Sequence, residues 1–193
     1  MRVLIACEFS GVVREAFRKR GHDAWSCDLE PAMDGSQFHV QGDAKKVVCS
    51  DWDLVIVHPP CTYLAVSGAR WWADRQTEQA EAAKFFMYFT HLCCRWAIEN
   101  PIGAMSRLYR KPDQIIQPWQ FGHGETKATC LWIHGLPPLQ STSVVPGREG
   151  RCWKESPGVV NGLTRQQRRS VTYQGIADAM AEQWGSFKGK GRR

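Results

Sequence analysis

The opening of the chain constrains the fold most, because two apolar runs flank a segment with helical periodicity. "RVLIA" (2–6) and "DAWSCDLEP" (23–31) have the composition of buried strands, and the second run ends in acidic residues. Between them, "GVVREAFRKRG" (11–21) groups its apolar residues on one helical face and ends at a glycine. A strand, a helix and a strand in this order predict two parallel strands joined by a right-handed crossover.

The alternation of strand and helix continues along most of the 193 residues. We therefore predict an α/β fold with a doubly wound, mostly parallel sheet, in one domain over residues 1–185. Within this domain, residues 134–171 are rich in loops and could be a reduced recognition segment. Residues 186–193 follow it as a basic tail. Residues 32–50 are expected to be a loop with room for a short helix. Further strands are expected at 53–57, 93–101 and 129–133, further helices at about 76–92 and 172–185, and a Pro-, Gly- and Ser-rich loop at 135–162.

The formal net charge is +6, which is compatible with a nucleic-acid partner but does not establish one. Positive residues concentrate in "TRQQRRS" (164–170) and in "FKGKGRR" (187–193), a pattern that fits either a nucleic-acid contact or a solvated surface and chain end. No apolar run approaches the ~18 residues that a membrane span requires, and the apolar stretch before Glu8 is too short for a signal peptide. We therefore expect a protein of the cytoplasm with no membrane partner.

Eight cysteines are scattered along the chain without a Cys-x-x-Cys pair. In a chain expected in the cytoplasm, this pattern argues against a disulfide framework. The adjacent Cys93 and Cys94 do not provide the spacing of zinc ligands, so no metal site is expected. Most of these thiols are expected to be small residues of the core.

Polar residues follow the expected strands, and in sheets of this kind ligands bind beyond the carboxyl ends of the strands. We therefore expect these residues to converge on one rim. An acid after the second strand is typical of a nucleoside-cofactor site, where it binds ribose hydroxyls. The residues concerned are residues 7–11, Asp28, Glu30, Asp43, residues 60–61 and residues 99–101.

Several quoted segments occur in a characteristic order between about residues 3 and 133: "ACEFSGVVREAFRKRGHDAWSCDLEP", "QGDA", "DLVIVHPPCTYLAVSGA", "AIENPIG" and "QFGHGETKATCLWI". In this order they resemble the DNA cytosine-5 methyltransferase family, and also short methyltransferase-like proteins of phages and prophages. The resemblance implies a Rossmann-like methyltransferase fold, S-adenosylmethionine as cofactor and DNA as partner. For a phage-encoded member, the compartment would be the host cytoplasm.

The resemblance also implies a cofactor site along the first half of the rim. The loop after the first strand would face the amino-acid part of the cofactor, and the next two positions would bind its nucleoside. The residues are Cys7, Glu8, Phe9, Ser10 and Gly11 for the loop, Asp28 for the ribose, Leu29 and Asp43 for the adenine, and His58 and Pro60 for the other side of the cofactor.

The resemblance makes Cys61 the nucleophile and Glu99 the acid that engages the cytosine. Cytosine C5 becomes reactive toward a methyl donor when a thiolate adds at C6, so the thiol is expected to have a pKa lowered by a helix N-terminus or by nearby cations. The two prolines before the thiol, which include Pro60, would restrict its movement, and Asn100 would help to fix the backbone turn at Glu99. A target base within a duplex would have to be flipped out.

Two features depart from the family. Residues 134–171 are the only room for a target-recognition region, and the family's two arginines near "ETKATCLWI" are replaced by Lys127 and Thr129. A lysine does not supply the bidentate donor pair of an arginine. Base binding is therefore expected to need another cation from the later loops, and the candidates are Arg148, Arg151 and Arg165.

Trp71 and Trp72 lie beside Arg70, where the family has a mobile loop over the flipped base. These indoles could stack on bases, or they could pack in the core. The last helix also has two interpretations: a cofactor contact near Gly175, or an ordinary amphipathic helix with residues 176, 180 and 184 inward.

Two other functions remain open from the sequence. One keeps pyrimidine-C5 chemistry but uses a modified donor, a free nucleotide or RNA, because a recognition region is lacking. The other is a degenerate, non-catalytic module that binds cofactor or DNA, because the second arginine is missing.

Overall fold

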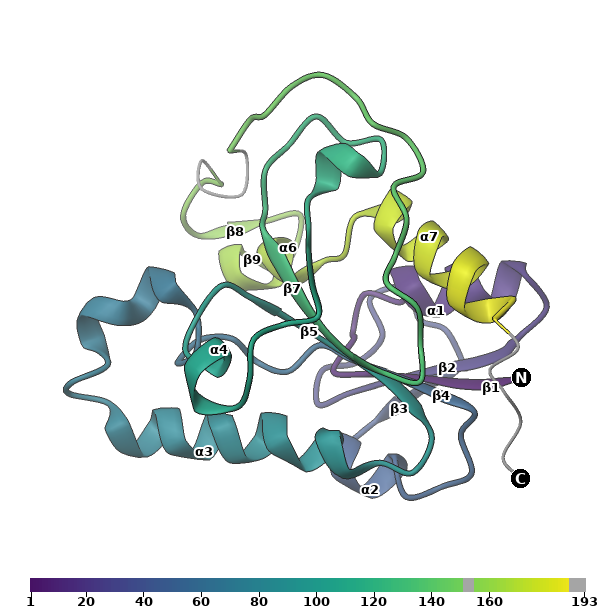
Figure 1. Cartoon of the computed structure of the whole chain (residues 1–193), viewed down its shortest axis with the longest axis horizontal. Coiled ribbons are helices and arrows are strands. Elements are labelled where there is room, and N and C mark those ends of the chain that lie inside the picture. Colours follow the sequence, from purple (N-terminus) through teal and green to yellow (C-terminus); the bar gives the residue numbers. More distant parts are fainter. Residues whose placement is uncertain (151–154, 188–193) are drawn as a thin grey trace.

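The computed structural model describes residues 1–150 and 155–187. In these residues one seven-stranded sheet has the order β3-β2-β1-β4-β5-β7-β6 (Figure 1). The first five strands pair in parallel, and β7 is antiparallel to both of its neighbours. The α/β class with a mostly parallel sheet is therefore confirmed. The strands are β1 (Arg2–Ala6), β2 (Asp23–Asp28), β3 (His39–Gln41), β4 (Leu54–Val57), β5 (Arg95–Pro101), β6 (Gln114–Ile116) and β7 (Thr129–His134).

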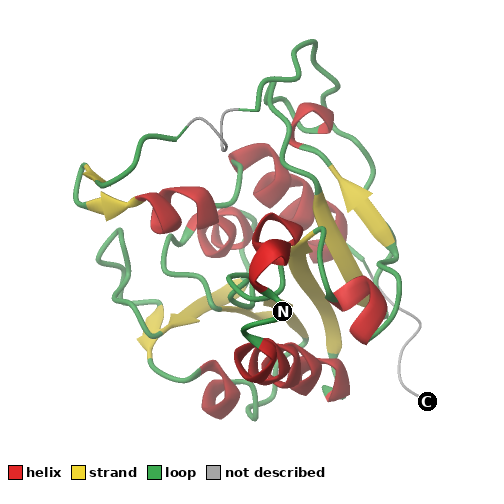
Figure 2. Cartoon of the chain, turned by 90° about the vertical axis from the view of Figure 1, so that its left-hand side faces the viewer, coloured by secondary structure: helices red, strands yellow, loops and turns green. Residues whose placement is uncertain are grey.

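Helices cover both faces of the sheet, as Figures 1 and 2 show. On one face α1 and α7 lie side by side, and α2 and α3 lie on the other. The helices are α1 (Val12–Lys19), α2 (Ala44–Val47), α3 (Gln76–Tyr88), α4 (Met105–Leu108), α6 (Arg165–Ser170) and α7 (Gln174–Gly185), with 3₁₀ turns at Val66–Trp71, Phe89–His91 and Pro118–Gln120.

The alternation of side chains along β1 explains the two layers. Val3 and Ile5 belong to the hydrophobic cluster under α1 and α7, whereas Leu4 and Ala6 belong to the cluster under α3. Successive side chains of a strand point to opposite faces, so a strand buried on both faces needs a continuous apolar run. The run in β4 (Leu54–Val57) is buried throughout in the same way.

The order of the strands reverses between β1 and β4, which lie next to each other. In open α/β sheets this switch point opens a crevice beyond the carboxyl ends of the strands. The segments that follow β1 and β4 are residues 7–11 and 58–61, so both flank the crevice. The fold therefore places the two halves of the expected site side by side.

Some expectations about local structure were incomplete or wrong. Residues 32–50 contain β3 as well as α2, β6 was not expected, and β8 (Val159–Val160), which pairs with β9 (Leu163–Thr164), lies in the expected loop. The inward positions expected for α7 are buried: Ile176, Met180 and Trp184.

Cysteines are less often buried than the sequence suggested. Of the described thiols, Cys27 and Cys130 are buried in the core, Cys7 and Cys94 are partly buried and pack against it, and three are exposed. The expectation that most are core residues therefore holds in part, and Cys152 lies outside the described residues. Within residues 1–150 and 155–187, no helix has both the length and the apolarity to cross a membrane.

Candidate functional site at the carboxyl ends of the strands

The loop after β1 turns sharply and returns into α1. Cys7 (φ 60°) and Gly11 (φ 74°) both have left-handed backbone conformations. Between them, the buried Glu8 carboxylate accepts hydrogen bonds from the backbone N–H groups of Val13 (2.7 Å) and Arg14 (3.2 Å). Burial raises the pKa of Glu8, and these bonds and nearby cations offset only part of that effect. Glu8 therefore caps α1 instead of offering its carboxylate to a ligand.

Phe9 and Ser10 are also buried within this loop. The Phe9 carbonyl accepts a hydrogen bond from the Met33 N–H at 2.9 Å, and the Ser10 hydroxyl donates to Glu8 at 3.4 Å. Because these two side chains pack within the loop, the groups of the loop that could contact a ligand are mainly its backbone and the Cys7 side chain.

Two carboxylates follow the next strands. Asp28 ends β2, and Asp43 caps α2; each accepts a backbone N–H two residues further on, at 3.0 and 2.9 Å. Burial raises the pKa of Cys7 far above its ordinary value, and the charges of Asp28 and Asp43 add to this effect. The three groups therefore lie close together, beside the exposed Leu29, and form an acidic, partly apolar edge that suits a ribose and an adenine.

The Pro-Pro-Cys corner after β4 is fixed from the neighbouring strand. Asn100 on β5 is buried, and its Nδ2 donates to the Pro59 carbonyl at 2.9 Å. The Cys61 carbonyl then accepts two backbone N–H groups, from residues 64 and 65, which closes a turn. Pro60 and Cys61 are exposed at this corner. The predicted role of Asn100 in fixing a corner is consistent with this hydrogen bond.

The segments after β4 and β5 are also joined to each other. The Val66 N–H donates to the Ile102 carbonyl (2.9 Å), and the Ala104 N–H donates to the Leu64 carbonyl (2.7 Å). Gly103 lies between them, and a Cβ at this position would overlap the Leu64 carbonyl. The glycine of "AIENPIG" is therefore required by a close approach of two backbones.

Glu99, on β5, lies against His58. Its Oε2 is 3.4 Å from His58 Nδ1, and its side chain is 21% exposed. Burial pushes the pKa of Glu99 upward, but the hydrogen bond and charge of His58, the charge of Lys127 and the hydroxyl of Thr129 together lower it. The structure thus brings Lys127 and Thr129 close to Glu99.

The environment of Cys61 corrects one expectation. Although Cys61 is exposed at the corner, the loss of solvent around its thiol raises its pKa, and the charge of Glu99 adds to this. Lys127 and Arg169 act in the opposite direction but do not outweigh burial. The expectation of a lowered pKa was therefore wrong, even though cations are present.

The aromatic segment beyond Cys61 divides between surface and core. Trp71 is 51% exposed, with the Arg70 guanidinium 5.0 Å from the centre of its ring, whereas Trp72 packs against the core on the α3 side. Both indoles border a cavity of about 190 Å³ next to the corner. Its lining residues are Thr62, Tyr63, Gly68, Trp71, Trp72 and Arg75.

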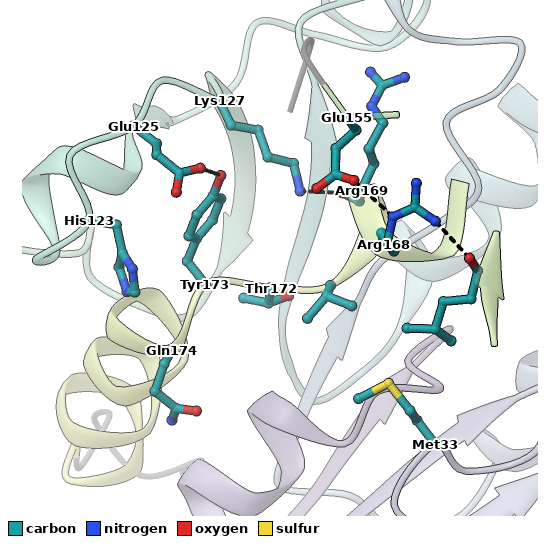
Figure 3. A pocket seen from close by; sticks show the side chains of 12 residues that line it. Met33, His123, Glu125, Lys127, Glu155, Arg168, Arg169, Thr172, Tyr173 and Gln174 are labelled. Carbon is teal, nitrogen blue, oxygen red and sulfur yellow. Dashed lines mark hydrogen bonds and ion pairs between the residues drawn. The ribbon is translucent and has the colours of Figure 1, made fainter. Parts of the chain in front are cut away.

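A larger cavity, of about 430 Å³, lies between α6, α7 and the loop before β7 (Figure 3). Lys127 and Arg169 both line it, and Lys127 Nζ donates to the Arg169 main-chain carbonyl at 2.7 Å. Arg169 was not among the candidate cations expected from the sequence. Of those candidates, Arg148 lies 3.9 Å from the centre of the Trp119 ring, and Arg151 lies outside the described residues.

Across residues 1–150 and 155–187, no three His, Cys, Asp or Glu side chains form a group that could hold a metal ion. The groups gathered at the rim are carboxylates on the β2 side, and a thiol, a carboxylate and cations on the β4–β5 side.

No protein-family model and no curated protein matches the chain.

Proposed function

We propose that this protein is a short, phage-type member of the DNA cytosine-5 methyltransferase family. It would transfer a methyl group from S-adenosylmethionine to C5 of cytosine in DNA, through a covalent bond between Cys61 and C6. The observation that carries the proposal is that Cys61, in the turn after β4, lies close to Glu99 on β5, the adjacent parallel strand. The two groups are close enough for the charge of Glu99 to affect the thiol, and Asn100 ties the two corners together.

The chain supplies the nucleophile of this reaction. The Cys61 thiolate would form an S–C6 bond, so that the C5–C6 π electrons can form a bond from C5 to the methyl carbon while the S–CH3 bond of the donor breaks and leaves a neutral thioether. Transfer of the C5 proton to solvent and cleavage of the S–C6 bond would restore the aromatic ring and the free thiolate. Because its pKa is raised, Cys61 must lose its proton to solvent or to a neighbouring base before it can attack.

Glu99 has the position and charge to hold the base. With a lowered pKa it is ionised near neutral pH, so it can accept a hydrogen bond from the amino group at C4. To act as an acid, the same carboxylate must first take up a proton from solvent as the base binds. Passing that proton to N3 would offset the negative charge that builds on the ring as the thiolate adds. His58 keeps the carboxylate oriented through its 3.4 Å contact.

The β1–β3 edge fits the proposed cofactor. Asp28 and Asp43 offer carboxylate oxygens at the strand ends, Leu29 presents an apolar side chain that is 74% exposed, and Cys7 shapes the loop between them. When bound, S-adenosylmethionine supplies an electrophilic methyl group. The residues of this edge would hold its nucleoside and direct its sulfonium end toward the β4 corner across the switch point.

A trapping assay tests the proposal. The protein is incubated with labelled S-adenosylmethionine and a duplex that contains 5-fluorocytosine, and the products are separated on a denaturing gel. Fluorine cannot leave as a proton does, so the mechanism predicts a stable protein–DNA adduct that Cys61→Ser abolishes. Cys49→Ser, which removes another exposed thiol, should leave the adduct unchanged.

Two outcomes would favour the other functions. Cofactor binding without an adduct on any substrate would indicate a non-catalytic module, in line with the raised pKa of Cys61. An adduct or methyl transfer with free nucleotide or RNA, but not with DNA, would indicate a pyrimidine-C5 transferase of a different substrate class, as would transfer from a modified donor alone.

A further inference from the structure

Helix α6 is held at two points, one at the Cys61 corner and one at the segment before β7. Gln166 Nε2 lies 3.5 Å from the hydroxyl of Thr62, the residue directly after the thiol. Lys127 Nζ donates to the Arg169 carbonyl at 2.7 Å, as Figure 3 shows. α6 therefore bridges the turn after β4 and the segment before β7.

The rest of α6 is fixed by its neighbours. The Thr164 hydroxyl caps the helix by accepting the Gln167 N–H at 3.2 Å. Arg168 donates to the Glu155 carboxylate (2.8 Å) and to the Leu163 carbonyl (2.7 Å), which ties the helix to the β8–β9 hairpin (Figure 3). Arg168 thus has a structural role, and the orientation of α6 is set before any ligand binds.

The register of α6 places Arg169 on the side of the thiol. Residues three apart share a helix face, so the contact from Gln166 to Thr62 brings Arg169 to the same side. Arg169 also lines the 430 Å³ cavity together with Lys127. The charges of both residues favour the thiolate of Cys61, which agrees with this placement.

We infer that Arg169 is the basic side chain that completes the Cys61–Glu99 site: its guanidinium faces the thiolate and, once a pyrimidine is bound, donates to the carbonyl oxygen of the base. The second part rests on the proposed function. An arginine offers a planar pair of N–H donors that the ammonium group of Lys127 does not. Lys127 instead holds the backbone of α6 in place.

The first test uses the protein without substrate. The pH dependence of Cys61 alkylation by iodoacetamide is measured by peptide mass spectrometry for wild type, Arg169→Gln, Arg169→Lys and Lys19→Gln. Lys19 is an exposed residue at the C-terminal end of α1, just before β2 begins, so it lies toward the amino ends of the strands and away from the rim that carries Cys61. Arg169→Gln should move the alkylation midpoint to higher pH and slow the reaction severalfold at pH 8, whereas Arg169→Lys and Lys19→Gln should remain close to wild type.

An unchanged midpoint in Arg169→Gln would overturn the inference, whether or not the wild type is a methyltransferase. Absence of a DNA adduct in the wild type, with the midpoint shift present, would count only against the proposed function and would leave Arg169 as the cation at the thiol. Circular dichroism of each variant establishes that the fold is intact.

The second test separates charge from hydrogen-bond geometry. At saturating 5-fluorocytosine DNA, Arg169→Lys keeps the charge but loses the planar donor pair, so adduct formation should slow about tenfold or more. Lys19→Gln, which removes an exposed charge outside α6, should affect at most salt-dependent DNA binding and leave the saturated rate unchanged. If Arg169→Lys and Arg169→Gln also change only salt-dependent binding, α6 is a phosphate-binding helix and the base-holding role is wrong.

Discussion

Cys7 and Cys61 follow neighbouring parallel strands at the same rim of the sheet, yet their surroundings differ. Burial is the main cause of the raised pKa of both thiols. Around Cys7, the further causes all act in the same direction, because its neighbours are Asp28, Asp43 and another thiol. Around Cys61, the carboxylate of Glu99 is opposed by two cations.

This difference shows that a place on the rim does not make a thiol reactive. Without a nearby cation to offset its acidic neighbours, Cys7 stays protonated and suits a wall of a binding site. Cys61 has nearby cations that can stabilise a thiolate once Glu99 is hydrogen-bonded to a bound cytosine. The contrast between the two thiols can be tested by removing, one at a time, the groups that create it.

The largest effect is expected from the thiols themselves. Cys61→Ser should lower adduct formation with 5-fluorocytosine DNA by at least about a thousandfold, because an alcohol is a far weaker nucleophile than a thiolate. Cys7→Ser should still form the adduct, with at most weaker binding of S-adenosylmethionine. Equal loss of the adduct in both variants, with cofactor binding intact, would contradict the distinction between the two positions.

Removing the carboxylate near Cys61 should have opposite effects on two measurements. Glu99→Gln removes a charge that raises the pKa of Cys61, so alkylation of the thiol should become faster at pH 8. Methyl transfer should nevertheless fall by about a hundredfold or more, because the amide cannot carry a proton to the base. Asp28→Asn, on the Cys7 side, should not change Cys61 alkylation. Faster alkylation together with unchanged turnover would remove Glu99 from the mechanism.

The hydrogen bond from Asn100 to Pro59 should have a moderate effect on stability. Asn100→Ala leaves the buried Pro59 carbonyl without its partner, which should lower the free energy of unfolding by about 1–3 kcal/mol. Gln79→Ala removes a similar bond to the Tyr63 carbonyl at a more exposed position, and it should cost less than about 1 kcal/mol. Urea unfolding followed by circular dichroism measures both values. Equal costs would mean that the corner is not held mainly through Asn100.

The sequence predicts those strands and rim residues of the sheet that a local pattern of apolar and polar residues identifies. The apolar runs of β1 and β4 are long enough to identify buried strands, and the polar residues after them follow from the sheet. β3 and β6 have three residues each, and their pairing depends on neighbours far along the chain, so no local pattern reveals them.

The same limit applies to the site. Glu8 has the position of a rim residue in the sequence, but the turn of its loop commits the carboxylate to α1. Arg169 belongs to the basic cluster at 164–170, and the sequence does not show which of its side chains lies near the thiol. Only the packing of α6 against the turn after β4 brings Arg169 to Cys61. The raised pKa of Cys61 arises from packing around the thiol, which residue types alone do not express.

The smallest effect is expected from Lys127, whose replacement should make Cys61 more similar to Cys7. Lys127→Met removes a charge that lowers the pKa of Cys61, so the pKa should rise further and the alkylation midpoint should move to higher pH. At pH 8 the alkylation rate should fall about threefold to tenfold, because each unit of pKa changes the thiolate fraction tenfold. The pKa of Glu99 should also rise, since Lys127 contributes to lowering it. Lys46→Met, on the exposed surface of α2, serves as the matched control. If Lys127→Met keeps the wild-type alkylation profile, Lys127 is not one of the cations that distinguish Cys61 from Cys7.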